Sequence, residues 1–355
     1  MRKVTGLLVA AVLATLVVGQ PAQAGTTTRY IDKIFTDVHL QEDVRYGQAV
    51  NSRGQLEQLL LDIYTPVGDT DTNRGLVVWA HGSGFRYGDK SDIGPLKEYV
   101  QRGWVGISLE YRMRPELPAN AFVGIVSDPT SVPTAQAAAR DAQHDMQAAI
   151  RWARANAGDL GVDPDLIVAD GMSAGAIMAL MVAFNEGDPG ESGTPGVSSA
   201  VAAAVSHAGA YAPVLQGAFP AAGAPPIAIY HGTHDEQVPF PTSPPACVLT
   251  LLVGNTCEYV AYVAREHAVL GADLAADFMY RYVIAPSSDT EITGLANVDA
   301  DTATGSVGAE HLVGGLGAVG GVVVPLDPNE IIEHTQDLIS YVTDALGLQA
   351  RALWR

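Results

Sequence analysis

Cysteines and charged residues are scarce in this sequence, and each shortage excludes a class of protein. The 355 residues include 2 cysteines, and charged residues make up 17% of the chain against 48% for the hydrophobic set. So little charge in so hydrophobic a chain excludes wholesale disorder, and the length is sufficient to bury a large core. Neither CxxC spacing nor a His/Cys cluster is present, so we expect no metal site.

Basic residues are the scarcer of the two charged kinds. There are 20 lysines and arginines against 39 aspartates and glutamates, which gives a formal net charge of −19. No run of basic residues follows the first few positions. Proteins that bind the phosphate backbone need clustered Lys and Arg, so we do not expect nucleic acid as a partner.

A long apolar run occurs only at the start of the chain. Arg2 and Lys3 precede the apolar stretch 6–18, and the Ala22-x-Ala24 pattern then fits a signal-peptidase site before Gly25. The alternative, a membrane anchor, needs about 20 apolar residues, and this run is shorter. We therefore predict a signal peptide over 1–24, a mature chain 25–355 secreted to the extracellular space or periplasm, and no membrane association after cleavage.

The only two cysteines, Cys247 and Cys257, are suited to that export route. They are ten positions apart in the sequence. An oxidising compartment would allow them to pair, so we predict a Cys247–Cys257 disulfide rather than two free thiols.

Strand-like and helix-like segments alternate along the mature chain. Short apolar or alternating runs predict strands, and apolar residues at helical spacing predict helices. The predicted strands are 44–50, 55–64, 75–80, 105–111, 166–169, 201–205, 226–230 and 278–284, and the predicted helices are 97–102, 133–156, 259–270 and 329–348. This alternation predicts an α/β fold, a single domain with a mostly parallel central sheet and helices on both faces.

A G-x-S-x-G motif lies where one predicted strand meets a helical stretch. It reads Gly171-Met-Ser173-Ala-Gly175, and it follows the strand 166–169. In this setting the motif is a nucleophile elbow, a tight turn that exposes the serine Oγ. The backbone N–H of Ala174 begins the following helix, so we expect it to stabilise a developing oxyanion. A simple turn serine is the alternative.

A glycine-rich loop directly follows the strand 75–80. It reads His81-Gly-Ser-Gly-Phe85, and its small residues would let backbone N–H groups approach a substrate carbonyl. We predict that Gly82, Ser83 and Gly84 complete an oxyanion hole with Ala174. A plain turn after a strand is the alternative.

These motifs and three others together resemble a known family, the α/β-hydrolase fold and its secreted carboxylesterase-like branch. The resemblance extends in family order from about residue 44 to residue 235. It rests on 78–90 (VWAHGSGFRYGDK), which is similar to the HGGGF stretch of that branch, on 108–112 (SLEYR), on Asp141 with 148–152 (AAIRW), on the serine elbow, and on 231–235 (HGTHD). Ser83 departs from the pattern, because the family usually has a glycine there.

The resemblance implies a Ser-Asp-His order for the catalytic residues. Asp235 matches the acid position, with Glu236 as its neighbour and competitor, although Asp235 could instead cap a turn. We assign the base to His311, which lies in a Gly-x-x-His sequence between the last predicted strand and the final helix. His334 and His267 remain alternatives, both in predicted helices. The long spacer 286–308 before His311 departs from the family.

The resemblance also implies an activity, the hydrolysis of carboxylic esters through an acyl-enzyme on Ser173. No cofactor is required for this chemistry. The substrate would be a small-molecule or polymer-attached ester. The same catalytic residues also act in feruloyl or acetyl-polysaccharide esterases, polyester esterases and peptidases, and an inactive binding protein is a further alternative. The sequence leaves the oligomeric state open.

Overall fold

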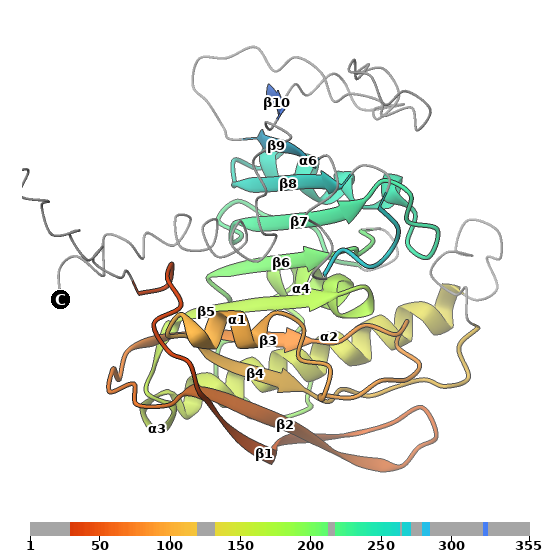
Figure 1. The fold of residues 1–355 in the computed structure, drawn as a ribbon. Helices are drawn as coiled ribbons and strands as arrows, with labels where there is room; N and C mark the ends of the chain where they lie inside the picture. The colour runs from red at the N-terminus through yellow and green to blue at the C-terminus, as the bar shows by residue number, and fades with distance from the viewer. Residues whose placement is uncertain are drawn as a thin grey trace, which may run out of the picture.

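A computed structural model describes the architecture around a single mixed sheet. It describes residues 29–118, 132–211, 217–262, 265–270, 279–284 and 322–325. Within these residues the sheet has ten strands in the order β1-β2-β4-β3-β5-β6-β7-β8-β9-β10, which run from the bottom to the top of Figure 1. The strands are β1 Val38–Val50, β2 Leu56–Pro66, β3 Arg74–Ala80, β4 Val105–Leu109, β5 Val162–Met172, β6 Ala203–His207, β7 Ile227–Gly232, β8 Cys257–Tyr262, β9 Met279–Ile284 and β10 Val322–Pro325.

The centre of the sheet is parallel and its edges are antiparallel. Strands β4, β3, β5, β6, β7 and β8 pair in parallel, whereas β1 and β2 at one edge and β9 and β10 at the other pair antiparallel. Every residue of β3, β4, β6, β7 and β8 is buried. Burial on both faces is why these strands read as continuous apolar runs rather than alternating ones.

Helices cover both faces of this sheet. They are α1 Leu96–Gln101, α2 Val132–Ala155, α3 Ala157–Leu160, α4 Ala174–Phe184 and α6 Pro244–Leu252, with the short 3-10 helix η3 Phe240–Thr242. Buried residues of α2, α4 and α6 belong to the same core cluster as Leu76 and Val78 of β3. Those of α1 pack in a separate cluster with Val77 and Trp79. Figure 1 shows α1 on the face of the sheet opposite α2. The alternation of a strand thus divides the core into two layers.

The predicted architecture is confirmed, and the predicted strands have counterparts within a few residues. One prediction is wrong: residues 259–270 do not form a helix. Strand β8 occupies Cys257–Tyr262 instead, and 265–270 follows it as a loop. Helix α6 was not predicted. Three predicted segments lie outside the described residues: the predicted signal peptide 1–24, the spacer 286–308 and the predicted helix 329–348.

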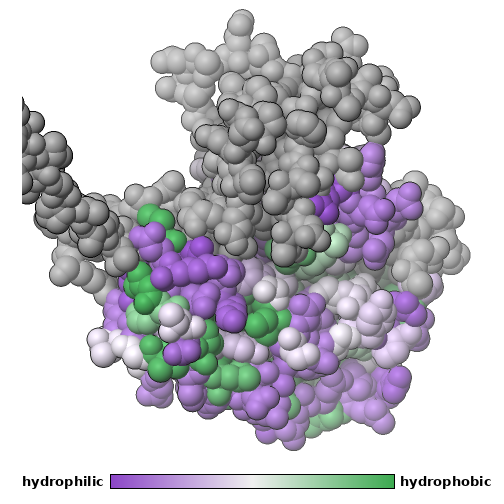
Figure 2. Space-filling view, viewed as in Figure 1, coloured by the Kyte–Doolittle hydropathy of each residue, from purple (hydrophilic) through white to green (hydrophobic). Residues whose placement is uncertain are grey.

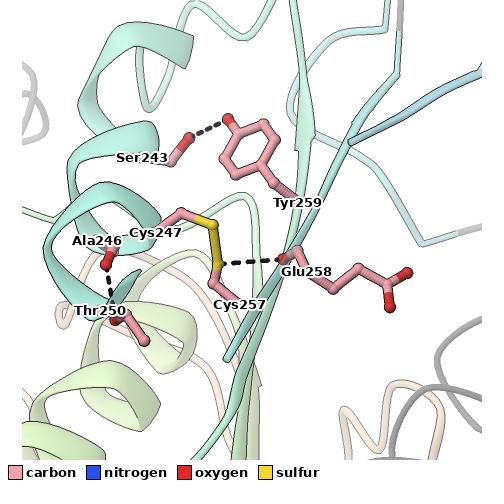
Figure 3. Close-up of a disulfide and its surroundings, with 7 residues drawn as sticks. All are labelled: Ser243, Ala246, Cys247, Thr250, Cys257, Glu258 and Tyr259. Carbon is pink, nitrogen blue, oxygen red and sulfur yellow. Dashed lines mark hydrogen bonds between the residues drawn. A yellow bond between two sulfur atoms is a disulfide. The ribbon is translucent and has the colours of Figure 1, made fainter. Parts of the chain in front are cut away.

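The predicted disulfide joins Cys247 of α6 to Cys257 at the start of β8 (Figure 3). Both cysteines are 1% exposed, and their Cα atoms are 5.4 Å apart. A second contact lies nearby, where the hydroxyl of Ser243, the N-cap residue of α6, is 2.6 Å from that of Tyr259 in β8. The crosslink therefore fixes α6 against the strand that leads to residues 265–270.

The described part of the surface in Figure 2 is mixed, with hydrophobic residues scattered among hydrophilic ones. Within the described ranges, no helix combines the length and the apolar character that crossing a membrane requires.

Candidate active site

Ser173 occupies the turn between β5 and α4. Its φ of 56° and ψ of −114° are uncommon for a residue with a side chain. The neighbouring glycines are required by space: a Cβ on Gly171 would lie 2.4 Å from the carbonyl carbon of Gly175, and one on Gly175 would lie 2.0 Å from Ala80 O. The close approach of strand and helix therefore explains both glycines of the predicted elbow.

A histidine and an aspartate continue from this serine in a hydrogen-bonded chain. Nε2 of His267 lies 2.8 Å from Ser173 Oγ, and its Nδ1 lies 2.7 Å from Asp235 Oδ2. The three residues come from the loops that follow β5, β7 and β8, which end at the same edge of the parallel sheet. The structure thus brings together two of the three predicted catalytic residues, Ser173 and Asp235.

The third residue differs from the sequence prediction. His311, which we assigned as the base, lies outside the described residues, as does the alternative His334. The structure places the other alternative, His267, within hydrogen-bond distance of both Ser173 and Asp235, so His267 is the candidate base among the described residues. The sequence analysis preferred His311 because 259–270 was assigned to one helix, which would have carried His267 away from the carboxyl edge of the sheet.

A signal for His267 was nevertheless present in the sequence. Residues 257–262 combine two tyrosines, a valine and an alanine in a short run that is buried at every position. Such a run predicts a buried strand as well as it predicts a helix. Read as a strand, it places His267 directly after the carboxyl end, in the Ser-Asp-His chain order.

Backbone hydrogen bonds hold the loop of His267 against the loop that carries Asp235. The N–H of Thr233 donates to Tyr262 O at 2.9 Å, and the N–H of His234 donates to Arg265 O at 2.8 Å. These bonds continue the pairing of β7 with β8 beyond the ends of the strands. Two side chains that are 32 positions apart in the sequence are therefore held together by main-chain contacts.

Gly232, the last residue of β7, allows these two loops to meet. A Cβ at this position would lie 2.3 Å from Glu266 O and 2.4 Å from Arg265 O. On the other side of His267, Val269 is fully buried in the α1-side core layer. The histidine is thus fixed by close packing before it and by an apolar anchor after it.

The environment of Asp235 keeps its carboxylate ionised. Burial alone would raise the pKa of Asp235, but hydrogen bonds from His231, His267 and the N–H of Val238 outweigh burial and hold the pKa well below its ordinary value. The N–H groups of Gln237 and Val238 lie 2.9 and 2.8 Å from Oδ1, and Nε2 of His231 lies 3.2 Å from Oδ2. An acceptor-only carboxylate is what orients a neutral imidazole.

The competing residues near Asp235 point elsewhere. Glu236 and His234 are exposed, whereas Asp235 is 5% exposed. The structure therefore supports the choice of Asp235 over Glu236 as the partner of the histidine.

The predicted oxyanion loop lies beside the serine. A Cβ on Gly82 would lie 3.2 Å from Ser173 Cβ. Ser83, Gly84 and Phe85 have φ values of 87°, 63° and 60°, so three successive residues are left-handed. Ser83, the departure from the family pattern, thus accepts a conformation that favours glycine. Strain of this kind is concentrated at functional sites.

Tyr111 anchors this loop from beneath. Its hydroxyl lies 2.8 Å from His81 O and 3.1 Å from Gly82 O, and its ring stacks on that of His81 with centroids 4.6 Å apart. Phe85 is fully buried, and its ring packs in a T-shaped arrangement with the ring of Tyr111. The tyrosine therefore fixes the peptide units that carry the N–H groups of Gly82 and Ser83, two of the predicted oxyanion donors.

The turn itself leaves one N–H group as the natural donor to an oxyanion. The N–H of Ser173 donates to His207 O at 2.8 Å and is therefore committed to the protein. Ala174 is the next residue and begins α4, whose N-terminal N–H groups have no partner in the preceding turn. Among the described residues, no group of three or more His, Cys, Asp or Glu side chains is arranged to hold a metal ion.

Comparison with known proteins finds a family model and several named esterases that are similar to this chain. The family described as BD-FAE matches residues 61–209. Esterase LipQ of Mycobacterium tuberculosis is 27% identical over 227 residues, which cover 55% of this chain and 49% of LipQ. An arylesterase of Saccharolobus solfataricus is 32% identical over 133 residues, covering 36% of each chain. The chain therefore spans about half or less of these curated relatives.

Among solved structures, native esterase 2 of Thermogutta terrifontis is similar with a TM-score of 0.50 and 26% identity, covering 65% of this chain and 85% of that one. A truncated carbohydrate esterase from gut microbiota has a TM-score of 0.50 at 19% identity and supports the fold alone. The sheet, the elbow and these similarities place the chain in the α/β-hydrolase fold. Within that fold, the chain is similar to proteins that are named as esterases.

Proposed function

We propose that this protein is a serine esterase that hydrolyses carboxylic esters through an acyl-enzyme on Ser173. The observation that carries the proposal is the hydrogen-bonded chain from Ser173 Oγ through His267 to Asp235, with distances of 2.8 and 2.7 Å. This arrangement of a nucleophile, a base and an orienting carboxylate is the geometry that activates a serine hydroxyl.

The protonation states follow from Asp235. Because its carboxylate only accepts, Nδ1 of His267 carries the hydrogen and donates it to Oδ2, which leaves Nε2 to accept from the Ser173 hydroxyl. Nε2 takes that proton as Oγ attacks the ester carbonyl, and Asp235 stabilises the imidazolium that forms. The imidazolium then protonates the departing alcohol. Water, deprotonated by the same Nε2, cleaves the acyl-enzyme and regenerates Ser173.

The oxyanion of each tetrahedral intermediate would be stabilised by backbone N–H groups. In this proposal the donors are Ala174 and the loop that contains Gly82, Ser83 and Gly84. Donors of this kind contribute about 10²–10³ each in rate because they are fixed before the charge develops.

The relatives favour an ester over an amide as the substrate, because those that match are named esterases or lipases. Thermogutta terrifontis esterase 2 has also been solved phosphorylated by paraoxon, an organophosphate. We extend this reactivity to Ser173. The substrate we propose is a small-molecule or polymer-attached ester.

Labelling with a fluorophosphonate probe tests the nucleophile. Wild-type protein should be labelled once, with the label on the peptide that contains Ser173, and Ser173→Ala should abolish it. Ser199→Ala is the matched control, because Ser199 is also buried, at 2% exposure against 9% for Ser173, and belongs to no part of the proposed site. Absence of labelling in folded wild-type protein would refute the proposal.

Turnover assays define the reaction. A chain-length series of p-nitrophenyl esters, with feruloyl and polymer substrates alongside, should show hydrolysis of at least the short esters. Cleavage of amides with no activity on any ester would instead identify a peptidase.

We also propose that the chain is exported after cleavage between Ala24 and Gly25. The Cys247–Cys257 disulfide supports this, since disulfides persist in oxidising compartments. N-terminal sequencing of the protein recovered outside the cytoplasm should begin at Gly25, and recovery only of the uncleaved chain in the cytoplasm would contradict export.

A further inference from the structure

A buried pair of polar side chains lies behind the nucleophile, on the face of the sheet opposite α4. Asp170 of β5 and His207 of β6 are both 0% exposed, and His207 Nε2 lies 3.0 Å from Asp170 Oδ1. Neither residue takes part in the proposed mechanism. Burying a carboxyl group and an imidazole is unfavourable unless they are paired, so their retention in the core calls for an explanation.

Aromatic side chains enclose the pair. The ring of Tyr230 stacks on His207 with centroids 5.4 Å apart, and Trp79 lies 6.0 Å from the same ring. From α1, Tyr99 adds a hydroxyl whose pKa is raised well above its ordinary value by burial and by the neighbouring Asp170. The imidazole of His207 therefore has little freedom to change its position.

The backbone connects this pair to the nucleophile. Met172 and His207 are partners in the ladder of β5 and β6, and beyond the ladder the N–H of Ser173 donates to His207 O at 2.8 Å. His207 therefore contacts this part of the chain twice, because its ring lies at Asp170 and its carbonyl accepts from Ser173. Gly171 and Met172 join Asp170 to Ser173, so the two contacts and this segment of chain form a closed ring.

This ring of contacts includes Ser173, the residue of the turn with the strained backbone conformation. Ser173 has φ of 56°, and a residue keeps such a conformation only when its surroundings impose it. On the α4 side, the surroundings are the close contacts of Gly171 with Gly175. On the opposite side, they are the contacts of His207.

We infer that Asp170 and His207 are a positioning pair, which holds the backbone of Ser173 in the conformation that aims Oγ at the substrate carbonyl and Ala174 N–H at the oxyanion. The inference rests on the proposed esterase function. Neither side chain touches substrate in this account. Their effect is on the orientation of Ser173 and therefore on kcat.

The test uses three variants of the full chain: Asp170→Asn, His207→Phe and the double variant. Asparagine keeps the shape of Asp170, and phenylalanine keeps the ring that stacks on Tyr230. Because displacement of a reacting atom by about 1 Å costs about 10²-fold, each single variant should lower kcat for p-nitrophenyl acetate by about 10- to 100-fold, with KM changed less than about twofold. The rate constant of fluorophosphonate labelling should fall in parallel.

The double variant separates a pair from two independent residues. If Asp170 and His207 act together, the double variant loses about as much kcat as the worse single variant. Losses that multiply would overturn the pairing.

A matched control distinguishes positioning from general stability. Asp69 has a side chain that is 4% exposed and lies 2.6 Å from Arg29. It precedes β3 at the amino end of the parallel strands, whereas Ser173 follows the carboxyl end of β5. Asp69→Asn should lower the melting temperature without changing kcat. If Asp170→Asn does the same, the pair is merely structural and the inference is overturned.

Two further outcomes complete the test. Tyr99→Phe, which removes only the hydroxyl beside Asp170, should lower kcat about threefold. It keeps the inference testable if the other variants do not fold, and unchanged kcat in Tyr99→Phe would then count against it. Failure of the esterase proposal itself is distinguishable, because wild-type Ser173 would then not be labelled at all.

Discussion

Replacing Gly232 by alanine tests whether close packing of two loops positions the proposed base. The new Cβ would lie 2.3 Å from Glu266 O and 2.4 Å from Arg265 O, whereas ordinary contacts begin at 3.4 Å. Both are backbone atoms, so the loop before His267 has to move by about 1 Å. Misplacement of a catalytic group on that scale costs about 10²-fold in rate.

We therefore expect Gly232→Ala to lower kcat about 100-fold on p-nitrophenyl acetate, with a smaller change in KM because no substrate contact is removed. Gly158→Ala is the matched control: nothing lies within 4 Å of its added Cβ, and it should retain wild-type kcat. Stopped assays over a range of substrate concentrations give both constants. Retention of kcat within threefold in Gly232→Ala would refute the idea that this packing sets the position of His267.

Three other predictions concern the disulfide, the oxyanion loop and the acid. Cys247→Ser should destabilise the fold by about 2.7 kcal/mol, because Cys257 is ten positions away, and lower the melting temperature by roughly 4 °C; an unchanged transition would refute this. Tyr111→Phe removes the hydroxyl that bonds two loop carbonyls, so calorimetry should show a free energy of unfolding that is lower by about 1–3 kcal/mol. In the same variant, kcat should fall by a larger factor than KM rises. The depressed pKa of Asp235 contributes stability at neutral pH that is lost as pH falls below about 4 toward the folded-state pKa. The difference in melting temperature between wild type and Asp235→Asn should therefore narrow in acid, and a constant difference would contradict the assigned ionisation.

Ser173 and Asp235 could be predicted from the sequence because their signals are local. A strand end, a glycine pair and a helix start lie within a few residues of Ser173, and Asp235 follows a short apolar strand. The physical constraints on these turns, such as the 2.0 Å approach of a Gly175 Cβ to Ala80 O, explain the letters of the motif.

His267 could not be predicted in the same way, because its position depends on long-range pairing. Residues 257–262 are compatible with a helix or a strand when taken alone, and pairing with β7 decides between them. The same limit applies to Asp170 and His207, which are 37 positions apart and meet only because β5 and β6 are neighbours in the sheet. Local patterns carry no information about such neighbours.

The identity of the base is the most direct test of the account. On a short-chain p-nitrophenyl ester, His267→Gln should lower kcat by at least about 10⁴-fold and slow fluorophosphonate labelling of Ser173, because no other group would take the serine proton. His311→Ala, measured alongside, should retain turnover within a few-fold of wild type. Near-native turnover in His267→Gln, together with loss of activity in His311→Ala, would contradict the catalytic chain from Asp235 through His267 to Ser173.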